Sequence, residues 1–258
     1  MITSVLVTRP DPQGSHLCAT LRAKGFECVH LPTLVIGPPS NIVRVEQALE
    51  NLAKQQWLIL ISPQAVYALE AFCIKNGLII SDSVNLAAVG AGTATLLRGL
   101  THREVHFPPT DWSAEGLLAL PVFQNVAQQK IMMLQGNAGR DVLLRTFIER
   151  KAYVEVVEVY QRLLPEMDME PYQKLLQNHA FNVIVSTSFS GVKNLKTLFG
   201  TMHWERLRQL PVIVVSNRIK ALAFELGYKT IWVAKNASDE AISTVLEEKR
   251  ESLWQMSK

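Results

Sequence analysis

Residues 58–66, LILISPQAV, contain the pattern that decides the fold of this chain. The apolar run is typical of a buried strand. It stops at Ser62, a residue type that suits a helix N-cap and is followed here by a proline. Helical spacing continues through Leu69 and Phe72 to Gly77, and glycine commonly ends helices. The stretch therefore predicts a strand followed by a helix, with the loop between them at the carboxyl end of the strand.

The same pattern recurs later in the chain at a constant distance. Residues 184–192, IVSTSFSGV, place Ser188 where the first copy has Ser62, an offset of 126 (188 − 62). Further pairs share this offset or one residue less: 5–7 with 131–133, Gly90 with Ser216, and Ser113 with Ser238. The repeat predicts two similar lobes with a cleft between them. The alternative is two unrelated α/β stretches of similar rhythm.

The fold class follows from the way in which predicted strands and helices alternate along the chain. Strongly apolar strands that alternate with helices of about ten to fifteen residues are typical of parallel sheets with helices on both faces, so we expect an α/β protein. Proline-containing connections near 37–40 and 164–168 indicate that the N-terminal strand and helix join the C-terminal half. The expected boundaries are 1–36 plus 165–258 for a discontinuous first lobe, 40–160 for the second, and 37–39 and 161–164 for the linker crossings.

Composition and charge narrow the class of function. The net charge is only +3, and the basic residues are scattered, which argues against a nucleic-acid partner. No apolar run reaches the roughly 18 to 20 residues of a membrane-spanning helix. The three cysteines never occur as CxxC, which argues against a disulfide framework or a cysteine-rich metal site. We therefore expect a cytoplasmic protein with neither nucleic-acid nor membrane contacts.

Small, hydroxylic and basic residues follow the predicted strands. Loops and helix N-termini meet at the carboxyl ends of parallel strands, where backbone N–H groups and helix dipoles favour anions. The candidate binding residues are Thr8, Arg9, Ser62, Gly90, Thr93, Gly136, Arg140, Ser188, Ser190, Ser216, Asn217 and Arg218. Plain helix capping is the alternative for Ser62, Ser188 and Ser216.

Common catalytic and cofactor motifs are missing from the sequence. There is no HExxH, no phosphate-binding GxxxxGK[ST] loop, and the six histidines show no ligand spacing, so we expect no metal. Gly90-Ala91-Gly92 begins like a dinucleotide fingerprint, but Thr95 replaces the third glycine. The residues alone thus indicate a two-lobed protein that binds an anionic ligand.

At these strand ends the sequence resembles the uroporphyrinogen-III synthase family. The resemblance rests on the order and spacing of short motifs along the whole chain. These motifs are VLVTRP at 5–10, SPQAV at 62–66, VGAGTA at 89–94, GNAGR at 136–140, VYQR at 159–162, TSFSGV at 187–192 and AFELG at 223–227. Each motif alone is weak, and their succession is specific.

The resemblance implies two α/β lobes joined by a two-stranded linker. It also implies a cofactor-free reaction in which hydroxymethylbilane, a linear tetrapyrrole with eight carboxylates, loses water and closes to uroporphyrinogen III with its last ring inverted. Tyr160 matches the family's candidate acid, and its alternative role is packing in the sheet. Where some members of the family have a threonine-rich turn in the C-terminal lobe, this chain has Ser216-Asn217-Arg218, which supplies a guanidinium for a carboxylate.

Other functions remain open from the sequence. A non-catalytic two-lobed module that binds a small polyanion would explain the repeat and the donor-rich loops equally well. We expect a monomer whose partner is its small-molecule substrate. A transient contact with the preceding enzyme of the pathway is left open.

Overall fold

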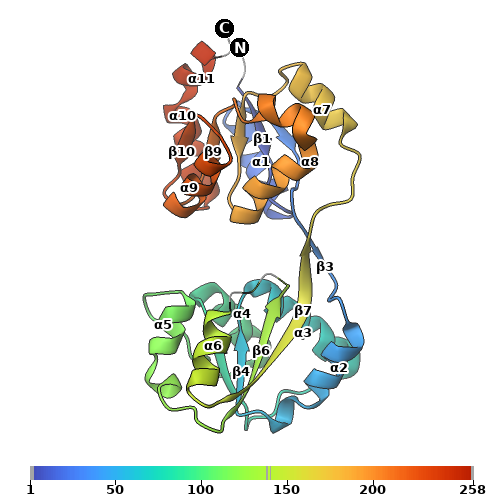
Figure 1. The fold of residues 1–258 in the computed structure, drawn as a ribbon, viewed down its shortest axis with the longest axis vertical. Coiled ribbons are helices and arrows are strands. Elements are labelled where there is room, and N and C mark those ends of the chain that lie inside the picture. Colours follow the sequence, from blue (N-terminus) through green and yellow to red (C-terminus); the bar gives the residue numbers. More distant parts are fainter. Residues whose placement is uncertain (1–2, 138, 140, 257–258) are drawn as a thin grey trace. The chain divides into compact units, whose positions relative to one another are not determined.

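The computed structural model describes residues 3–137, 139 and 141–256, and Arg140 lies outside the described residues. The chain divides into two compact units (Figure 1). Unit 1 comprises Met1–Val35 and Leu163–Lys258, and unit 2 comprises Ile36–Arg162. Strands β3 (Val35–Gly37) and β7 (Tyr153–Leu163) carry the chain from one unit to the other, and they are neighbours in one sheet.

Unit 1 is built on a five-stranded sheet of order β10-β9-β8-β1-β2, in which all neighbouring strands are parallel. The strands are β1 (Ser4–Val7), β2 (Glu27–His30), β8 (Val183–Val185), β9 (Val212–Val214) and β10 (Ile231–Val233). The helices are α1 (Gln13–Ala23), α7 (Glu170–Gln177), α8 (Phe189–Leu207), α9 (Asn217–Glu225), α10 (Asp239–Glu248) and α11 (Arg250–Met256).

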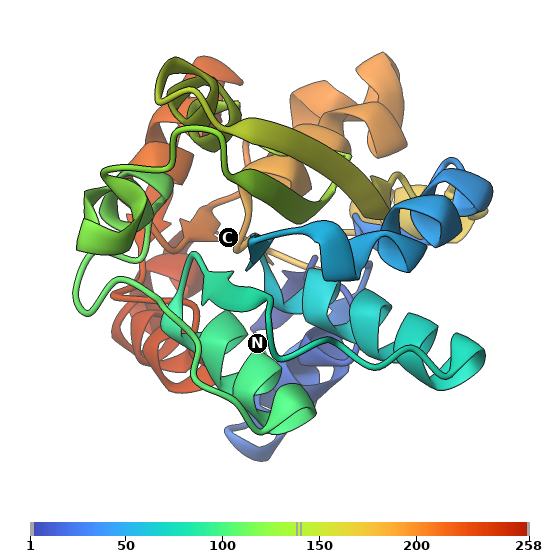
Figure 2. The same ribbon diagram turned by 90° about the horizontal axis from the view of Figure 1, so that it is seen from below.

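Unit 2 carries a second five-stranded sheet, of order β3-β7-β6-β4-β5. Its further strands are β4 (Trp57–Leu60), β5 (Asn85–Ala88) and β6 (Lys130–Gly136). Its helices are α2 (Ile42–Glu50), α3 (Pro63–Asn76), α4 (Ala91–Thr101), α5 (Ala114–Ala119) and α6 (Val142–Glu149), with 3₁₀ turns at Leu52–Lys54 and Pro121–Phe123. Figure 2 shows these blue-to-green helices flanking the strands.

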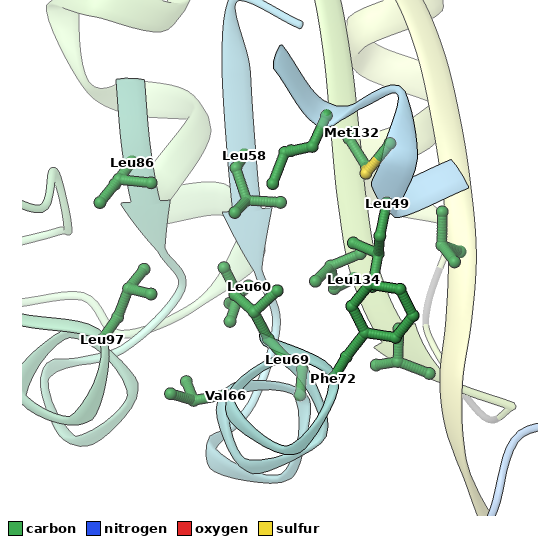
Figure 3. Close-up of a cluster of buried hydrophobic side chains, with 14 of the residues drawn as sticks. Leu49, Leu58, Leu60, Val66, Leu69, Phe72, Leu86, Leu97, Met132 and Leu134 are labelled. Atoms are coloured by element: carbon green, nitrogen blue, oxygen red, sulfur yellow. The ribbon is translucent and has the colours of Figure 1, made fainter. Parts of the chain in front are cut away.

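The strands are apolar because helices cover both faces of each sheet. In unit 2, Leu58 and Leu60 of β4 pack with Leu69 and Phe72 of α3 on one face (Figure 3). The residue between them, Ile59, belongs to a separate cluster with residues of α5 and α6 on the other face. Unit 1 has the same two-cluster arrangement around its own sheet. The expected α/β class with parallel sheets between helices is confirmed.

The two sheets have the same strand order once the repeat is applied. Strands β2, β1, β8 and β9 of unit 1 correspond to β7, β6, β4 and β5 of unit 2. The counterpart of β10 is reduced to a single parallel bridge between Ala87 and His106, although the sequence favours a strand over 105–107. None of the described helices is long and apolar enough to cross a membrane.

Candidate functional site

A pocket of about 250 Å³ lies at the carboxyl ends of β4, β5, β6 and β7 within unit 2. Its apolar lining comes from Ile61, Val89, Ala114 and Leu143, and its polar lining from Ser62, Ser113, Gln135, Tyr160 and Arg162. Trp112, Gly136 and Gly139 complete the walls. Of the candidate residues predicted from sequence, this pocket brings Ser62, Gly136 and Tyr160 together.

Tyr160 is fixed against the end of the neighbouring strand. Its side chain is buried, and its ring lies directly over Gly136 of β6. A Cβ atom on Gly136 would sit 2.5 Å from Cζ of Tyr160, so only glycine admits the ring at this distance. Strand pairing and the missing side chain of Gly136 together determine where the phenol hydroxyl lies.

The hydroxyl of Tyr160 has two hydrogen-bond partners. It lies 3.0 Å from Oγ of Ser62, and it accepts a hydrogen bond of 3.2 Å from Nη2 of Arg162. A guanidinium can only donate, so the phenol oxygen is the acceptor in the second bond. The phenol proton is therefore left for Ser62 or for a ligand, which is the arrangement expected of a proton or hydrogen-bond donor.

Ser62 differs from the other serines that precede helices. The side chains of Ser188 and Ser216 accept hydrogen bonds from backbone amides in the first turns of α8 and α9, at 2.9 and 3.3 Å. Ser62 makes no such cap on α3, because its hydroxyl is paired with Tyr160 instead. Capping thus describes the geometry of Ser188 and Ser216, while Ser62 belongs to the pocket.

The first turn of α4 lies beside the pocket. Gly90 occupies the N-cap position with extended backbone, and Thr93 is buried within the first turn. The first amides of any α-helix lack partners within the helix, so this turn offers N–H donors to a ligand. A Cβ atom on Gly90 would lie 3.6 Å from Cβ of Trp112, which places the start of α4 against the pocket wall.

Among the lining residues that were not predicted as site residues from sequence, three bear on the chemistry of the pocket. Arg162 lies two residues after Tyr160 in β7, and the period of two along a strand could have placed both on one face. Trp112 precedes the N-cap Ser113 and is a large aromatic residue in a strand-end loop, which is a usable signal. Gln135 carries a buried Oε1 atom without a hydrogen-bond partner, and nothing in the sequence marks that.

The candidate residues of unit 1 include two whose polar groups are already engaged. Thr8 is buried and donates its hydroxyl to the carbonyl of Val185 at 2.9 Å. Arg9 forms an ion pair of 2.9 Å with Asp239, and both side chains are largely buried, at 14% and 18% exposed. Asp239 also lies 2.5 Å from Nδ1 of His16. These contacts tie β1 and α1 to the start of α10.

The remaining candidates of unit 1 lie at the starts of α8 and α9. Asn217 and Arg218 are exposed and Ser190 is partly exposed. The guanidinium of Arg218 stands over the ring of Phe189, with Cζ 5.4 Å from the centroid. Because β8 and β9 are neighbours in the sheet, the two helix starts lie at one edge of unit 1.

The structural environment also shifts the pKa of one carboxyl in unit 1. The hydroxyl of Ser15 donates a hydrogen bond to Asp11, just before α1, and holds the pKa of that carboxyl below its ordinary value. Asp11 therefore stays ionised near neutral pH.

Among the described residues, no three His, Cys, Asp or Glu side chains gather as a metal site requires.

Comparisons with known proteins give matches over most of the chain. A family model described as "Uroporphyrinogen-III synthase HemD" matches residues 15–243. A protein named uroporphyrinogen-III synthase from Escherichia coli K12 is 30% identical over 247 residues, covering 95% of this chain and 100% of the relative. A protein of the same name from Synechococcus elongatus is 30% identical over 201 residues, covering 77% of this chain and 75% of the relative.

Two solved structures resemble the fold. A mutant uroporphyrinogen III synthase from the bacterium Thermus thermophilus superposes with a TM-score of 0.67 at 15% identity, covering 96% of this chain and 99% of that one. Uroporphyrinogen-III synthetase from Helicobacter pylori 26695 gives a TM-score of 0.59 at 17% identity, with coverage of 96% and 99%. At these identities the likeness concerns the fold.

Proposed function

The chain belongs to the uroporphyrinogen-III synthase family, and we propose that it converts hydroxymethylbilane to uroporphyrinogen III, with loss of water and inversion of the last ring. It is an enzyme of tetrapyrrole biosynthesis, a cyclising lyase. Family membership favours this function over the alternative, a non-catalytic protein that binds a small polyanion.

The observation that carries the proposal in chemical terms is the hydroxyl of Tyr160 in the unit 2 pocket. It lies 3.0 Å from the hydroxyl of Ser62 and accepts from Arg162 at 3.2 Å, so its proton is not used by the bond with Arg162. The substrate's hydroxymethyl group loses its oxygen with the electrons of the C–O bond. A proton from Tyr160 turns the leaving group into water, and the tyrosine is reprotonated when the ring-closing carbon loses its proton. General acid help of this kind contributes about a hundred- to ten-thousandfold.

The size of the pocket suits one ring of the substrate. Its volume of about 250 Å³ lies below the roughly 300 to 1,000 Å³ of sites that enclose a whole drug-sized ligand. One pyrrole with its acetate and propionate groups fits such a space. Arg162, Ser113 and the amides at the starts of α3 and α4 are donors of the kind that bind carboxylates.

We propose the other candidates as contacts for the remaining carboxylates. In unit 2 these are Gly90 and Thr93, at the start of α4. In unit 1 they are Thr8, Arg9, Ser188, Ser190, Ser216, Asn217 and Arg218. Ser190, Asn217 and Arg218 are the better supported members, because their polar groups are accessible, whereas Arg9 already shares its charge with Asp239. The proposed lobes are 1–36 plus 165–258 and 40–160.

Location and assembly complete the proposal. Cys18, Cys28 and Cys73 are free, which supports a reducing compartment such as the cytoplasm. We propose a monomer as the working unit, because the groups around Tyr160 in unit 2 suffice for the proposed proton transfer without a second copy of the chain. We further propose a transient contact with the preceding enzyme of the pathway, because that enzyme supplies the substrate.

The reaction itself provides the test. Purified protein is incubated with enzymatically generated hydroxymethylbilane, and the products are oxidised to porphyrins and separated by isomer. We expect isomer III as the main product. Unassisted closure gives isomer I, so a product mixture containing isomer I alone would overturn the assignment.

A further inference from the structure

Trp112 is a lining residue of the pocket that holds Tyr160. The residue is 63% exposed, although it lines the pocket wall. A single exposed aromatic residue is common on protein surfaces and by itself indicates nothing. Its place is informative here, because it stands in the wall of the space where Tyr160, Ser62 and Arg162 present their polar groups.

The backbone that carries Trp112 is fixed on both sides. The amide of Ser113 donates to the carbonyl of Asp111 at 2.8 Å, which closes a tight turn around Trp112. The hydroxyl of Ser113 then caps α5 by accepting from the amide of Gly116 at 3.0 Å. A side chain at Gly116 would clash with the carbonyl of Asp111, so this glycine lets the loop pack onto the helix. The indole is thus attached to a defined point of the wall.

The other aromatic side chain of the lining cannot offer a free face in the same way. The ring of Tyr160 is buried against Gly136, and Cζ of Arg162 lies over this ring, 5.8 Å from its centroid. The indole of Trp112 is solvent-accessible, and its face can be covered by a flat ring. Indole is also the side chain with the strongest attraction for a cation over its face.

The repeat strengthens the case. With the offset of 125 that relates Ser113 to Ser238, the counterpart of Trp112 in unit 1 is Ala237. Two positions further on, Ala114 in unit 2 corresponds to Asp239 in unit 1, and Asp239 forms an ion pair with Arg9. Unit 2 alone therefore combines an aromatic wall at this position with an open pocket beside it.

We propose that Trp112 is the wall on which the reacting pyrrole ring stacks. This inference rests on the proposed function and adds a residue to it. When the hydroxyl leaves as water, the ring and its nitrogen are left with a delocalised positive charge, and the indole face stabilises that charge by a cation–π contact. The same contact holds the ring near the hydroxyl of Tyr160, so the residue both positions the ring and touches the reacting group.

Fluorescence offers a direct test of contact. Trp57 and Trp204 are buried and Trp232 is only partly exposed, so the indoles most accessible to acrylamide are those of Trp112 and Trp254. In a Trp254→Phe protein, uroporphyrinogen III added without oxygen is expected to lower the slope of acrylamide quenching at least about twofold, because it covers Trp112. In a matched protein that carries Trp112→Phe and Trp254→Phe, the product should leave the slope unchanged.

Kinetics separates stacking from simple coverage. Trp112→Leu is expected to lower kcat/KM by about tenfold and Trp112→Phe by about threefold, with the larger part of the loss in kcat. Trp254→Phe, which lies outside the pocket, is the control and should match wild type. The inference is wrong if wild type forms isomer III while Trp112→Leu keeps wild-type kinetics, or if a saturating concentration of product leaves the quenching of Trp112 unchanged. Absence of isomer III with the wild type would instead overturn the proposed function.

Discussion

The regions at the carboxyl ends of β6 in unit 2 and of β1 in unit 1, called the corners of the two units below, have the same backbone frame. They differ in the side chains that occupy them. By the repeat, Gln135 corresponds to Arg9, and Ala114 corresponds to Asp239. In unit 1 the two positions form an ion pair of 2.9 Å that occupies the corner. In unit 2 the equivalent pair cannot form an ion pair, and a pocket of about 250 Å³ lies there.

The difference extends to the residues around the corner. Tyr160 and Trp112 line the pocket of unit 2, while unit 1 has Leu34 and Ala237 at the corresponding positions. The sheets, the helix starts and the capping pair Ser113 and Ser238 are common to both units. A duplicated fold thus supplies the frame twice, and a few exchanged side chains decide which copy offers a pocket with an acid and an aromatic wall.

Filling the pocket of unit 2 with the residues of unit 1 should have the largest effect. A protein carrying Gln135→Arg and Ala114→Asp would place an ion pair where the substrate ring is proposed to bind. Turnover is expected to fall by at least about a hundredfold, because even a small misplacement of the reacting ring costs that much. The measurement is the single-turnover rate with the enzyme in excess over hydroxymethylbilane.

The matched control carries Gln135→Met and Ala114→Asn, which places uncharged side chains of comparable length at the two positions without an ion pair. Its loss of rate should be clearly smaller. Equal losses in both proteins would mean that any change at these positions disturbs the site and would weaken the comparison with unit 1. Circular dichroism checks that both proteins keep the helical content of wild type.

Removing the phenol hydroxyl is expected to have the next largest effect. Tyr160→Phe keeps the ring that packs on Gly136 and removes the group that contacts Ser62 and Arg162. We expect kcat to fall by at least about tenfold, as for loss of a general acid. Unchanged kinetics would leave Tyr160 a packing residue of the sheet, like its counterpart Leu34.

The ion pair of unit 1 should contribute to stability. Asp239→Asn leaves the guanidinium of Arg9, which is 14% exposed, without its carboxylate. We expect the free energy of unfolding to fall by about 1 kcal/mol, since the pair is partly buried. Urea unfolding measures this, and Asp141→Asn, which alters the exposed i,i+4 pair with Arg145, is the control with little expected change. Equal stability of Asp239→Asn and wild type would show that the pair fills space without stabilising unit 1.

The smallest effect is expected in the core of unit 1. Tyr228 is 1% exposed, its hydroxyl has no hydrogen-bond partner, and burial raises its pKa above the ordinary value. Tyr228→Phe removes this unpaired group and should leave stability unchanged or raise it by up to about 1 kcal/mol.

The raised pKa of Tyr228 also has a pH signature. Above about pH 10 the unfolded chain loses the phenol proton that the folded chain retains, so the unfolded state is favoured and stability falls with rising pH. Tyr228→Phe should reduce the steepness of this fall between about pH 10 and 11. Parallel curves for the two proteins in urea unfolding would contradict the inferred burial penalty.

Most of the two-lobed fold could be predicted from the sequence. Apolar runs ending in serine predicted the strand–helix units around Ser62 and Ser188, because strand burial and capping are local properties. The offset of 126 predicted two similar lobes, because the same local patterns recur in both halves of the chain. The predicted strand over 105–107 was wrong, because a single bridge between His106 and Ala87 forms there. Strand pairing depends on partners that are distant in the sequence, and a local pattern does not specify them.

The site was less accessible to sequence reasoning. Ser62 looks like an N-cap, and only the fold brings Tyr160, 98 residues away, within 3.0 Å of its hydroxyl. Arg9 looks like an anion-binding residue, and its pairing with Asp239 spans 230 residues. The position of Trp112 depends on the close approach of Asp111 to Gly116, which no local pattern specifies. Long-range packing decides these roles.

Isomer analysis of the filled-pocket protein tests the central claim most directly. Wild type and the protein carrying Gln135→Arg and Ala114→Asp are each incubated with enzymatically generated hydroxymethylbilane, and the ratio of isomers III and I is measured. If the corner beyond β6 holds the reacting ring, wild type yields mainly isomer III and the filled protein yields mainly isomer I from unassisted closure. Formation of isomer III by the filled protein at the wild-type rate would contradict the account.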